Sequence, residues 1–442
     1  MRNNAEMRNQ SRNDSTSECT DGRRLIALCA TLACFAVVAG DTRAGDWPQI
    51  LGPNRNGVAE GESIVDRFPA GGPQTVWQRS VGSGYAGIAV ADGIAVLFHR
   101  LRDKEIVEAM DAATGDVKWT AEFDAKYRPS FIDDSGPRAV PVIHNSRVYV
   151  YGAQGGLHCL ELQSGKTVWS RKAFDELGPK RPFRGEPPEG YFGIGSCPLV
   201  EGNLLLVNVG GDSKQAGIVA FALADGKTVW TATDERASYS SPVAATIDGV
   251  RHVFFATRLN ALSIDPKTGD TRFSLPFGEP GPKVTGANPL VIDGHLLLTA
   301  SYGVGAVYAK IESNRADIQW TSDNTLSSQY TTSIVENGAV YGVHGRQDMG
   351  RAALRCIDPV TQKVLWSEDG FGYATLIKAD GKLLVMKTDG ELVLVQLSPQ
   401  SYRELDRAQL LNGTARALPA LSNGSLFVRD ERTLRCVQLG RP

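Results

Sequence analysis

The sequence of 442 residues predicts an all-β protein, an eight-bladed β-propeller with four strands in each blade. Two independent repeats predict this fold. One is a β-hairpin turn that recurs every 43 to 56 residues, and the other is an apolar strand followed by a polar turn and an aromatic residue. This spacing is the length of one propeller blade. A third observation, that the last repeat is split between the two ends of the chain, predicts how the ring closes.

Each predicted hairpin turn lies between two short apolar runs. Six of the eight turns are Asn-Gly or Asp-Gly pairs, which tolerate the positive φ angles of the type I′ turn that suits a two-residue hairpin. One turn per blade gives eight blades. The eight turns are Asp92-Gly93, Asn145-Ser146, Glu201-Gly202, Asp248-Gly249, Asp293-Gly294, Asn337-Gly338, Asp380-Gly381 and Asn423-Gly424.

The second repeat gives the same number of blades. Its aromatic residues are Trp119, Trp169, Trp230, Phe273, Trp320 and Trp366, with Leu405 in a degenerate seventh copy. The eighth copy has only its first half at the C-terminus, and the missing half is the segment around Trp77. We therefore expect this N-terminal strand to join the last blade, which removes the open edge of an unclosed ring.

The segment from Met110 to Trp119 (MDAATGDVKW) resembles the PQQ-like repeat, named after pyrroloquinoline quinone, in which an Ala-x-Asp-x-x-Thr-Gly stretch precedes a Trp. The resemblance covers roughly residues 75–442 and implies that the tryptophans dock between neighbouring blades. Asp46-Trp47-Pro48-Gln49 is similar to the lead-in of exported PQQ-like proteins. We therefore assign residues 45–74 to a lead-in segment and residues 75–442 to the propeller.

Residues 1–44 are predicted to be a leader outside the fold. Two arginines precede the apolar run Leu25–Gly40, whose sixteen residues suit a signal peptide and are few for a membrane span. We expect export through this signal, to the periplasm or the medium, and no membrane-spanning segment in the mature chain. The alternatives that stay open are translation from Met1 or Met7, cleavage after Gly40 or Ala44, twin-arginine export through Arg23-Arg24, and a lipid anchor at Cys34.

Composition excludes some classes of function. The net charge of −2, without a dense run of Lys or Arg, does not favour a nucleic-acid partner. Four cysteines follow the leader, and this number is too small for a disulfide framework. We expect all four to be free and packed as small apolar side chains. Cys197 is the conceivable partner for Cys159 if a bridge forms. We expect a monomer.

The candidate site follows from the order of strands in a blade. Turns between the first and second and between the third and fourth strands lie on one face and are short here. The other connections, such as residues 120–136 and 170–195, are long and meet where the innermost strands begin, together with Tyr85. Long loops on a rigid scaffold are where binding residues usually lie. The candidate ligand-binding residues are Arg138, Tyr191, Tyr239, Tyr330, His344, Asp348, Tyr373 and Arg416.

Tyrosines and two arginines around a channel mouth suit an anionic or planar ligand, and the alternative is that they only plug and solvate the channel. We expect a binding or scaffolding module for a protein, peptide or polysaccharide, with no required cofactor and no metal. The resemblance implies a second class, a PQQ-dependent alcohol dehydrogenase of the polyvinyl-alcohol type that holds PQQ and Ca²⁺.

The chain lacks the adjacent cysteines of the eight-bladed enzymes and has no Cys-x-x-Cys-His haem attachment. Acids stand near the mouth, but their spacing identifies no metal site. The sequence therefore favours the binding module and leaves enzyme activity undecided. These acids are Asp133, Asp134, Asp212 and Asp348.

Overall fold

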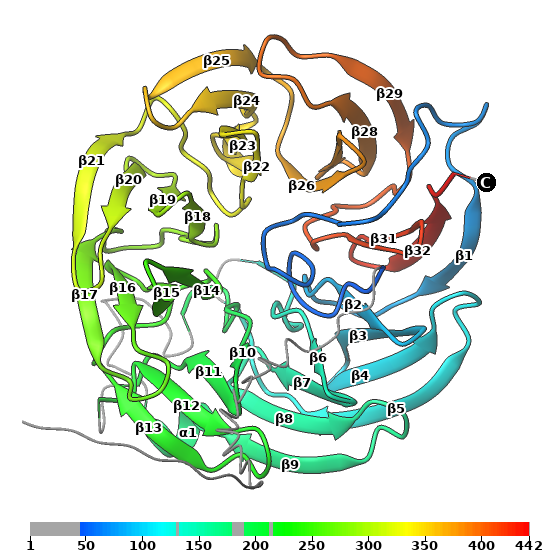
Figure 1. Cartoon of the computed structure of the whole chain (residues 1–442). Coiled ribbons are helices and arrows are strands. Elements are labelled where there is room, and N and C mark those ends of the chain that lie inside the picture. The colour runs from blue at the N-terminus through cyan, green and yellow to red at the C-terminus, as the bar shows by residue number, and fades with distance from the viewer. Residues whose placement is uncertain (1–44, 130–131, 179–189, 212–214, 442) are drawn as a thin grey trace, which may run out of the picture. The chain divides into compact units, whose positions relative to one another are not determined.

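The computed structural model describes residues 45–129, 132–178, 190–211 and 215–441. They belong to one compact unit, residues 42–442, in which eight four-stranded antiparallel sheets form a ring (Figure 1). The predicted eight-bladed β-propeller is therefore confirmed. Within these ranges no helix has both the length and the apolar character that crossing a membrane requires. The predicted leader lies outside the described residues.

Each blade runs from its inner to its outer strand in chain order, except the last. Blade one holds β2 (Ile88–Ala91), β3 (Ile94–Leu101), β4 (Lys104–Asp111) and β5 (Val117–Asp124). Blade two holds β6 (Val142–His144), β7 (Arg147–Tyr151), β8 (Gly156–Glu161) and β9 (Thr167–Lys172), and the short helix α1 (Ala173–Leu177) follows. Blade three holds β10 (Leu199–Glu201), β11 (Leu204–Asn208), β12 (Ile218–Ala222) and β13 (Thr228–Ala232). Blade four holds β14 (Val243–Ile247), β15 (Val250–Ala256), β16 (Asn260–Ile264) and β17 (Thr271–Pro276).

The second half of the ring repeats this order. Blade five holds β18 (Leu290–Ile292), β19 (His295–Ala300), β20 (Gly305–Ile311) and β21 (Ala316–Ser322). Blade six holds β22 (Ile334–Glu336), β23 (Ala339–His344), β24 (Ala353–Asp358) and β25 (Lys363–Glu368), with the 3-10 helix η2 (Gln347–Met349) between β23 and β24. Blade seven holds β26 (Ala374–Ala379), β27 (Lys382–Lys387), β28 (Glu391–Gln396) and β29 (Glu404–Gln409). Blade eight holds β30 (Ala420–Ser422), β31 (Ser425–Arg429), β32 (Thr433–Gln438) and, as its outer strand, β1 (Thr75–Ser80).

Seven of the eight hairpin turns lie where the sequence predicts them. Both residues of each of these turns have positive φ, as at Asp92 (51°) and Gly93 (72°), which is the type I′ geometry. The turn in blade three is shifted by one residue from the prediction. Glu201 pairs with Leu204 as the last residue of β10, so the turn is Gly202-Asn203, with the glycine first.

The tryptophans join neighbouring blades, as the resemblance implied. Trp119 in blade one donates its indole N–H to the carbonyl of Leu162 in blade two at 2.7 Å, and its ring lies against Gly165. Trp169 makes the same contacts with Leu223 and Gly226 of blade three. Glycine suits Gly165 and Gly226 because their φ is positive and a Cβ there would meet the ring at less than 3 Å.

The N-terminal strand closes the ring in the predicted way. β1 pairs antiparallel with β32, and Trp77 lies opposite Cys436. Trp77 then donates to the carbonyl of Ala112 in blade one at 3.0 Å, which is the contact that joins the other blades. The edge that β32 would expose is thereby paired.

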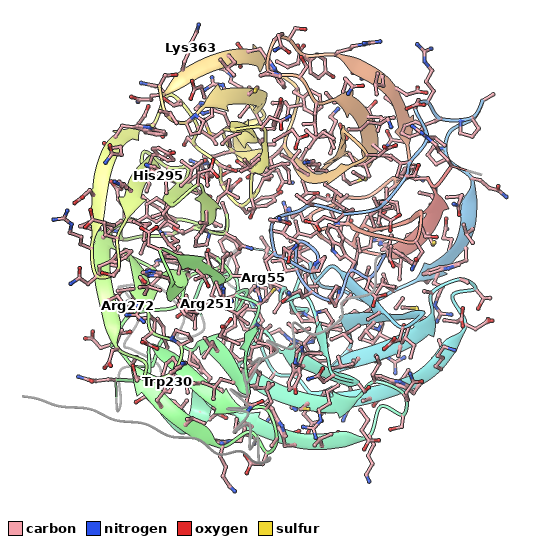
Figure 2. All side chains as sticks on the ribbon, viewed as in Figure 1. Arg55, Trp230, Arg251, Arg272, His295 and Lys363 are labelled. Carbon is pink, nitrogen blue, oxygen red and sulfur yellow. The ribbon has the colours of Figure 1, made fainter. Side chains whose placement is uncertain are left out.

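The lead-in segment before β1 crosses the centre of the ring. Trp47 exchanges two backbone hydrogen bonds of 2.8 Å with Val90 in blade one, and the segment around Val58 pairs with Lys378 in blade seven. Between these points Arg55, which Figure 2 labels near the centre of the ring, donates to the carbonyls of Cys197 and Pro198 in blade three. The lead-in therefore fills the channel on the side of the hairpin turns.

A chain of side-chain hydrogen bonds joins the inner strands close to the opposite face. In blades two to five, one backbone N–H donates to the side chain at the equivalent position of the next blade, over 2.8–3.1 Å. The residues are Val140, Cys197, Ser241, Asn288 and Thr332, in ring order. Cys197 is thus an acceptor between blades. It and the other three cysteines of the described chain are buried and free, which confirms the expectation of four free thiols.

We predict that Trp77→Ala lowers the free energy of unfolding by about 3–5 kcal/mol, because the change leaves a cavity at the closing blade and removes the hydrogen bond to Ala112. Urea denaturation measures this change in the free energy of unfolding. Val76 is the matched control, since it lies in the same strand and is 44% exposed. Val76→Ala should change the stability by less than about 0.5 kcal/mol. Equal effects of the two changes would contradict the closure by Trp77.

Candidate ligand-binding cavity at the channel mouth

The same residue position precedes the inner strand of every blade. It is occupied in ring order by Tyr85, Arg138, Gly195, Tyr239, Gly286, Tyr330, Tyr373 and Arg416. The sequence analysis placed Tyr191 at this point of blade three, whereas the structure has Gly195 there. It also missed Gly286 in blade five, because a glycine carries no side chain that marks a site.

Seven of these eight positions line one cavity of about 420 Å³, a size within the usual range for small-ligand pockets, about 300–1,000 Å³. The loops of blades five and six add further residues, and Ile50 of the lead-in lines it as well. The lining residues are Ile50, Tyr85, Ile132, Arg138, Phe192, Gly195, Tyr239, Val284, Gly286, Tyr302, Gln329, Tyr330, Gln347, Asp348, Arg416 and Leu418. Ile50 thus brings the lead-in segment into the wall of the cavity.

Tyr85 lies between the two arginines. The Arg138 guanidinium carbon is 5.3 Å from the centre of the Tyr85 ring, and that of Arg416 is 5.1 Å from it. Arg416 also donates from Nη1 to the Tyr85 hydroxyl at 2.8 Å. Burial raises the pKa of Tyr85, while the two cations oppose the shift, so the phenol keeps its proton at neutral pH. Tyr85 can therefore donate that proton to a ligand.

The two arginines are held in different ways. Arg138 and Asp134 have side chains that are 9% and 8% exposed and form an ion pair, with 3.4 Å between Nη1 and Oδ1. Asp134 also accepts the backbone N–H groups of Gly84 and Gly136 at 2.7 and 2.9 Å. Arg416, by contrast, has no carboxylate within 4 Å in the part of the chain that the structure describes. Its charge acts on Asp348 across the mouth, but without an ion pair of its own the guanidinium can bind an anion from outside.

Gln347 connects Arg416 to the next tyrosine around the mouth. Its side-chain oxygen accepts from Arg416 Nε at 2.9 Å and from the Tyr330 hydroxyl at 3.0 Å. Its backbone N–H donates to Gln329, which in turn donates to the Tyr302 hydroxyl at 2.6 Å. This polar chain holds η2 over the mouth, and the sequence analysis did not identify Gln347 or Gln329.

Across the ring from the arginines the lining is mostly aromatic and apolar. Phe192 and Tyr239 contact edge to face, with ring centres 5.7 Å apart. A Cβ at Gly195 would lie 3.1 Å from the Tyr239 ring, and one at Gly286 would lie 2.7 Å from Tyr330 Cβ. The two glycines therefore leave room for the tyrosines of the next blades.

Of the eight predicted residues, Arg138, Tyr239, Tyr330, Asp348 and Arg416 meet at the cavity, and three do not line it. Tyr373 is 4% exposed, and its hydroxyl accepts the backbone N–H groups of Tyr330 and Thr331, so it supports the wall from behind. Tyr191 is also 4% exposed, with its ring 5.9 Å from the guanidinium of Arg258.

His344 ends β23 and anchors the loop that carries η2. Its Nδ1 accepts the backbone N–H of Ser327 at 3.1 Å, which assigns the proton of the neutral ring to Nε2. Burial lowers the pKa of His344 to about 4, with Arg355 adding to the shift. The His344 ring is therefore neutral at pH 7.

A Ca²⁺-bound quinone requires several oxygen ligands around one point, usually with carboxylates among them. No three His, Cys, Asp or Glu side chains among them are placed to hold a metal ion. Asp348 is paired with Arg346, at 2.9 Å between Oδ1 and Nε, and Asp134 is held by Arg138 and two backbone N–H groups. Asp133 is exposed, and Asp212 lies outside the described residues. The residues at the mouth thus do not fit a calcium–quinone centre.

Eight blades, six of them anchored by a tryptophan, around a mouth whose residues differ from blade to blade define a PQQ-like repeat propeller. Residues 102–368 match the family model described as outer membrane protein assembly factor BamB, and the chain belongs to this PQQ-like repeat family. No curated protein matches the sequence.

Solved structures with the same fold come from proteins of different kinds. BamB from Moraxella catarrhalis aligns with a TM-score of 0.59 at 17% identity, over 83% of this chain and 97% of its own. Quinohemoprotein alcohol dehydrogenase from Comamonas testosteroni aligns with a TM-score of 0.62 at 14% identity, over 91% and 82%. The computationally designed Ika8 protein aligns with a TM-score of 0.52 at 12% identity, over 86% and 100%. At these identities the likeness concerns the fold alone.

We predict that His344 makes stability depend on pH. Its pKa is about 4 in the folded state and about 6.5 when unfolded, so the unfolded chain binds more protons between these values. Stability should therefore fall as pH falls from about 6.5 to about 4. His344→Asn, which keeps an acceptor for Ser327, should lose less stability than the wild type between pH 7 and pH 5 in urea denaturation. An unchanged loss would contradict the buried neutral histidine.

Proposed function

We propose that this propeller is a binding module, and that its ligand places an anionic group in the mouth cavity. One observation supports this most: two arginines flank the same tyrosine ring in one cavity, and Arg416 forms no ion pair with a carboxylate of the described residues. The groups that surround this point are hydrogen-bond donors, namely the two guanidinium groups and the protonated Tyr85 phenol. Arg138 already pairs with Asp134, so it is Arg416, together with the Tyr85 phenol, that most favours an added anion.

The kind of partner follows from the family. The family model and one structural neighbour carry the name of an assembly factor, which supports a protein-binding or scaffolding role over a catalytic one. We therefore propose a protein, peptide or polysaccharide partner. We also propose that the protein is exported, on the signal-like run Leu25–Gly40, and N-terminal sequencing of the mature chain would test this.

The alternative, a PQQ-dependent alcohol dehydrogenase, draws support from the dehydrogenase among the structural neighbours and from arginines that suit carboxylates. Against it stands the lack of a calcium ligand set among the described residues. We predict that the purified protein, mixed with PQQ and Ca²⁺, shows no dye-linked oxidation of ethanol or polyvinyl alcohol above the protein-free control. Turnover that requires both PQQ and the protein would establish the enzyme instead.

The binding proposal is tested on the arginines. Each charge-assisted hydrogen bond contributes about 1.5–3 kcal/mol, so Arg138→Gln and Arg416→Gln should each weaken an anionic ligand roughly tenfold to a hundredfold. Titration calorimetry measures the affinity, with ligands first found by a thermal-shift screen of carboxylates, phosphates and sulfates. Arg403→Gln is the matched control, because Arg403 is exposed between β28 and β29 on the opposite face. Wild-type affinity in the double variant Arg138→Gln/Arg416→Gln would reject the cavity as the anion site.

A further inference from the structure

The two ends of the cavity differ in charge. This difference restricts the class of ligand that the cavity can bind. Building on the proposed function, we propose that the anionic group is a single carboxylate carried on a large apolar or aromatic body. The C-terminal residue of a peptide and a free carboxylic acid of the same build share this chemistry.

The cations of the cavity lie at one end. Arg138 and Arg416 are the lining residues with a positive charge, and both flank the same ring, that of Tyr85. They belong to blades two and eight, with Tyr85 in blade one between them, so the cationic wall spans three adjacent blades. Arg416 uses Nε and Nη1 for Gln347 and Tyr85, which leaves Nη2 for the ligand. One carboxylate can accept from Nη2 and from the Tyr85 hydroxyl together.

The opposite end cannot bind a second anion well. Its lining includes Phe192, Tyr239, Val284 and Tyr302, none of which carries a charge. The acidic lining residue of the cavity is Asp348, which is paired with Arg346 and follows Gln347, the acceptor of Arg416 Nε, so a second carboxylate would meet a negative charge there. A ligand with several carboxylates would therefore leave charges against aromatic rings, at a desolvation cost.

The rest of the lining favours an apolar body. Gly195 and Gly286 leave space beside the rings, since a Cβ at either position would press on a tyrosine of the next blade. Ile50 from the lead-in adds an aliphatic side chain to the lining. Buried aromatic and aliphatic side chains gain free energy when they cover apolar area of a ligand. The body of the ligand should therefore lie across these rings, with its carboxylate at Tyr85.

The experiment compares four probes by titration calorimetry: N-acetyl-phenylalanine, its amide, acetate and citrate. N-acetyl-phenylalanine has both the carboxylate and the body, the amide lacks the charge, acetate lacks the body, and citrate carries three carboxylates without a body. We expect N-acetyl-phenylalanine to bind at least tenfold more tightly than each of the others. Arg416→Gln should remove this preference for the acid over the amide, and Phe192→Ala should reduce its advantage over acetate, while Arg403→Gln changes neither.

The outcomes separate the two proposals. If citrate or acetate binds as tightly as N-acetyl-phenylalanine and Arg416→Gln weakens it, the anion site stands and the single carboxylate on an apolar body is wrong. If the amide binds as tightly as the acid, carboxylate recognition is wrong. If no probe binds in the wild type, or if Arg138→Gln/Arg416→Gln leaves the binding unchanged, the anion-binding function itself fails at this cavity.

Two further probes distinguish the sources of the carboxylate. One is a hexapeptide that ends in Leu-Phe with a free C-terminus, measured against its C-terminal amide, and the other is decanoate. Tighter binding of the free hexapeptide than of both N-acetyl-phenylalanine and decanoate would assign the site to peptide C-termini. Tighter binding of decanoate would assign it to free acids. Both results support the proposed chemistry, whereas a hexapeptide amide that binds as tightly as the free acid contradicts it.

Discussion

The pairing of β1 with β32 is the contact on which the rest of the structure depends. A propeller blade buries its two faces only against neighbouring blades, so the first and last blades of an open arc would each expose an apolar face. β1 ties the two ends of the chain into one sheet, and Trp77 then joins blade eight to blade one by the contact that Trp119 and Trp169 make elsewhere. Only in a closed ring do the segments before all eight inner strands meet at one mouth.

The mouth shows how a repeat fold separates scaffold from site. One backbone position recurs in every blade, and its side chain is free to vary because the blade is held by its hairpin turn, its tryptophan and the hydrogen bonds between inner strands. Arginines at blades two and eight and glycines at blades three and five turn this ring of equivalent positions into a cavity with two unlike ends. In this chain a few substitutions on a repeated frame thus distinguish the site.

The lead-in segment completes the cavity. Arg55 is 3% exposed and donates to the carbonyls of Cys197 and Pro198, and burial lowers its pKa to about 10. An arginine buried against carbonyl groups rather than a carboxylate is costly unless its hydrogen bonds are satisfied, which these contacts and Gln49 provide in part. The same segment places Ile50 in the lining of the cavity, together with the tyrosines and arginines of the mouth.

Local and periodic signals in the sequence determined the blade count, seven of the eight hairpin turns, the anchoring tryptophans and the strand that closes the ring. They also placed Arg138, Tyr239, Tyr330, Asp348 and Arg416 at one mouth, because the start of an inner strand can be read from the hairpin that follows it. Only the tertiary structure decided which side chains face the cavity. Tyr373 turns behind Tyr330, His344 turns toward Ser327, and Gly195 replaces Tyr191 at the ring position. The bond between Arg416 and Tyr85 joins residues 331 positions apart, and Ile50 in the lining comes from outside the repeats. Such contacts depend on side-chain direction and on how distant blades are brought together, and no pattern within one blade contains that information.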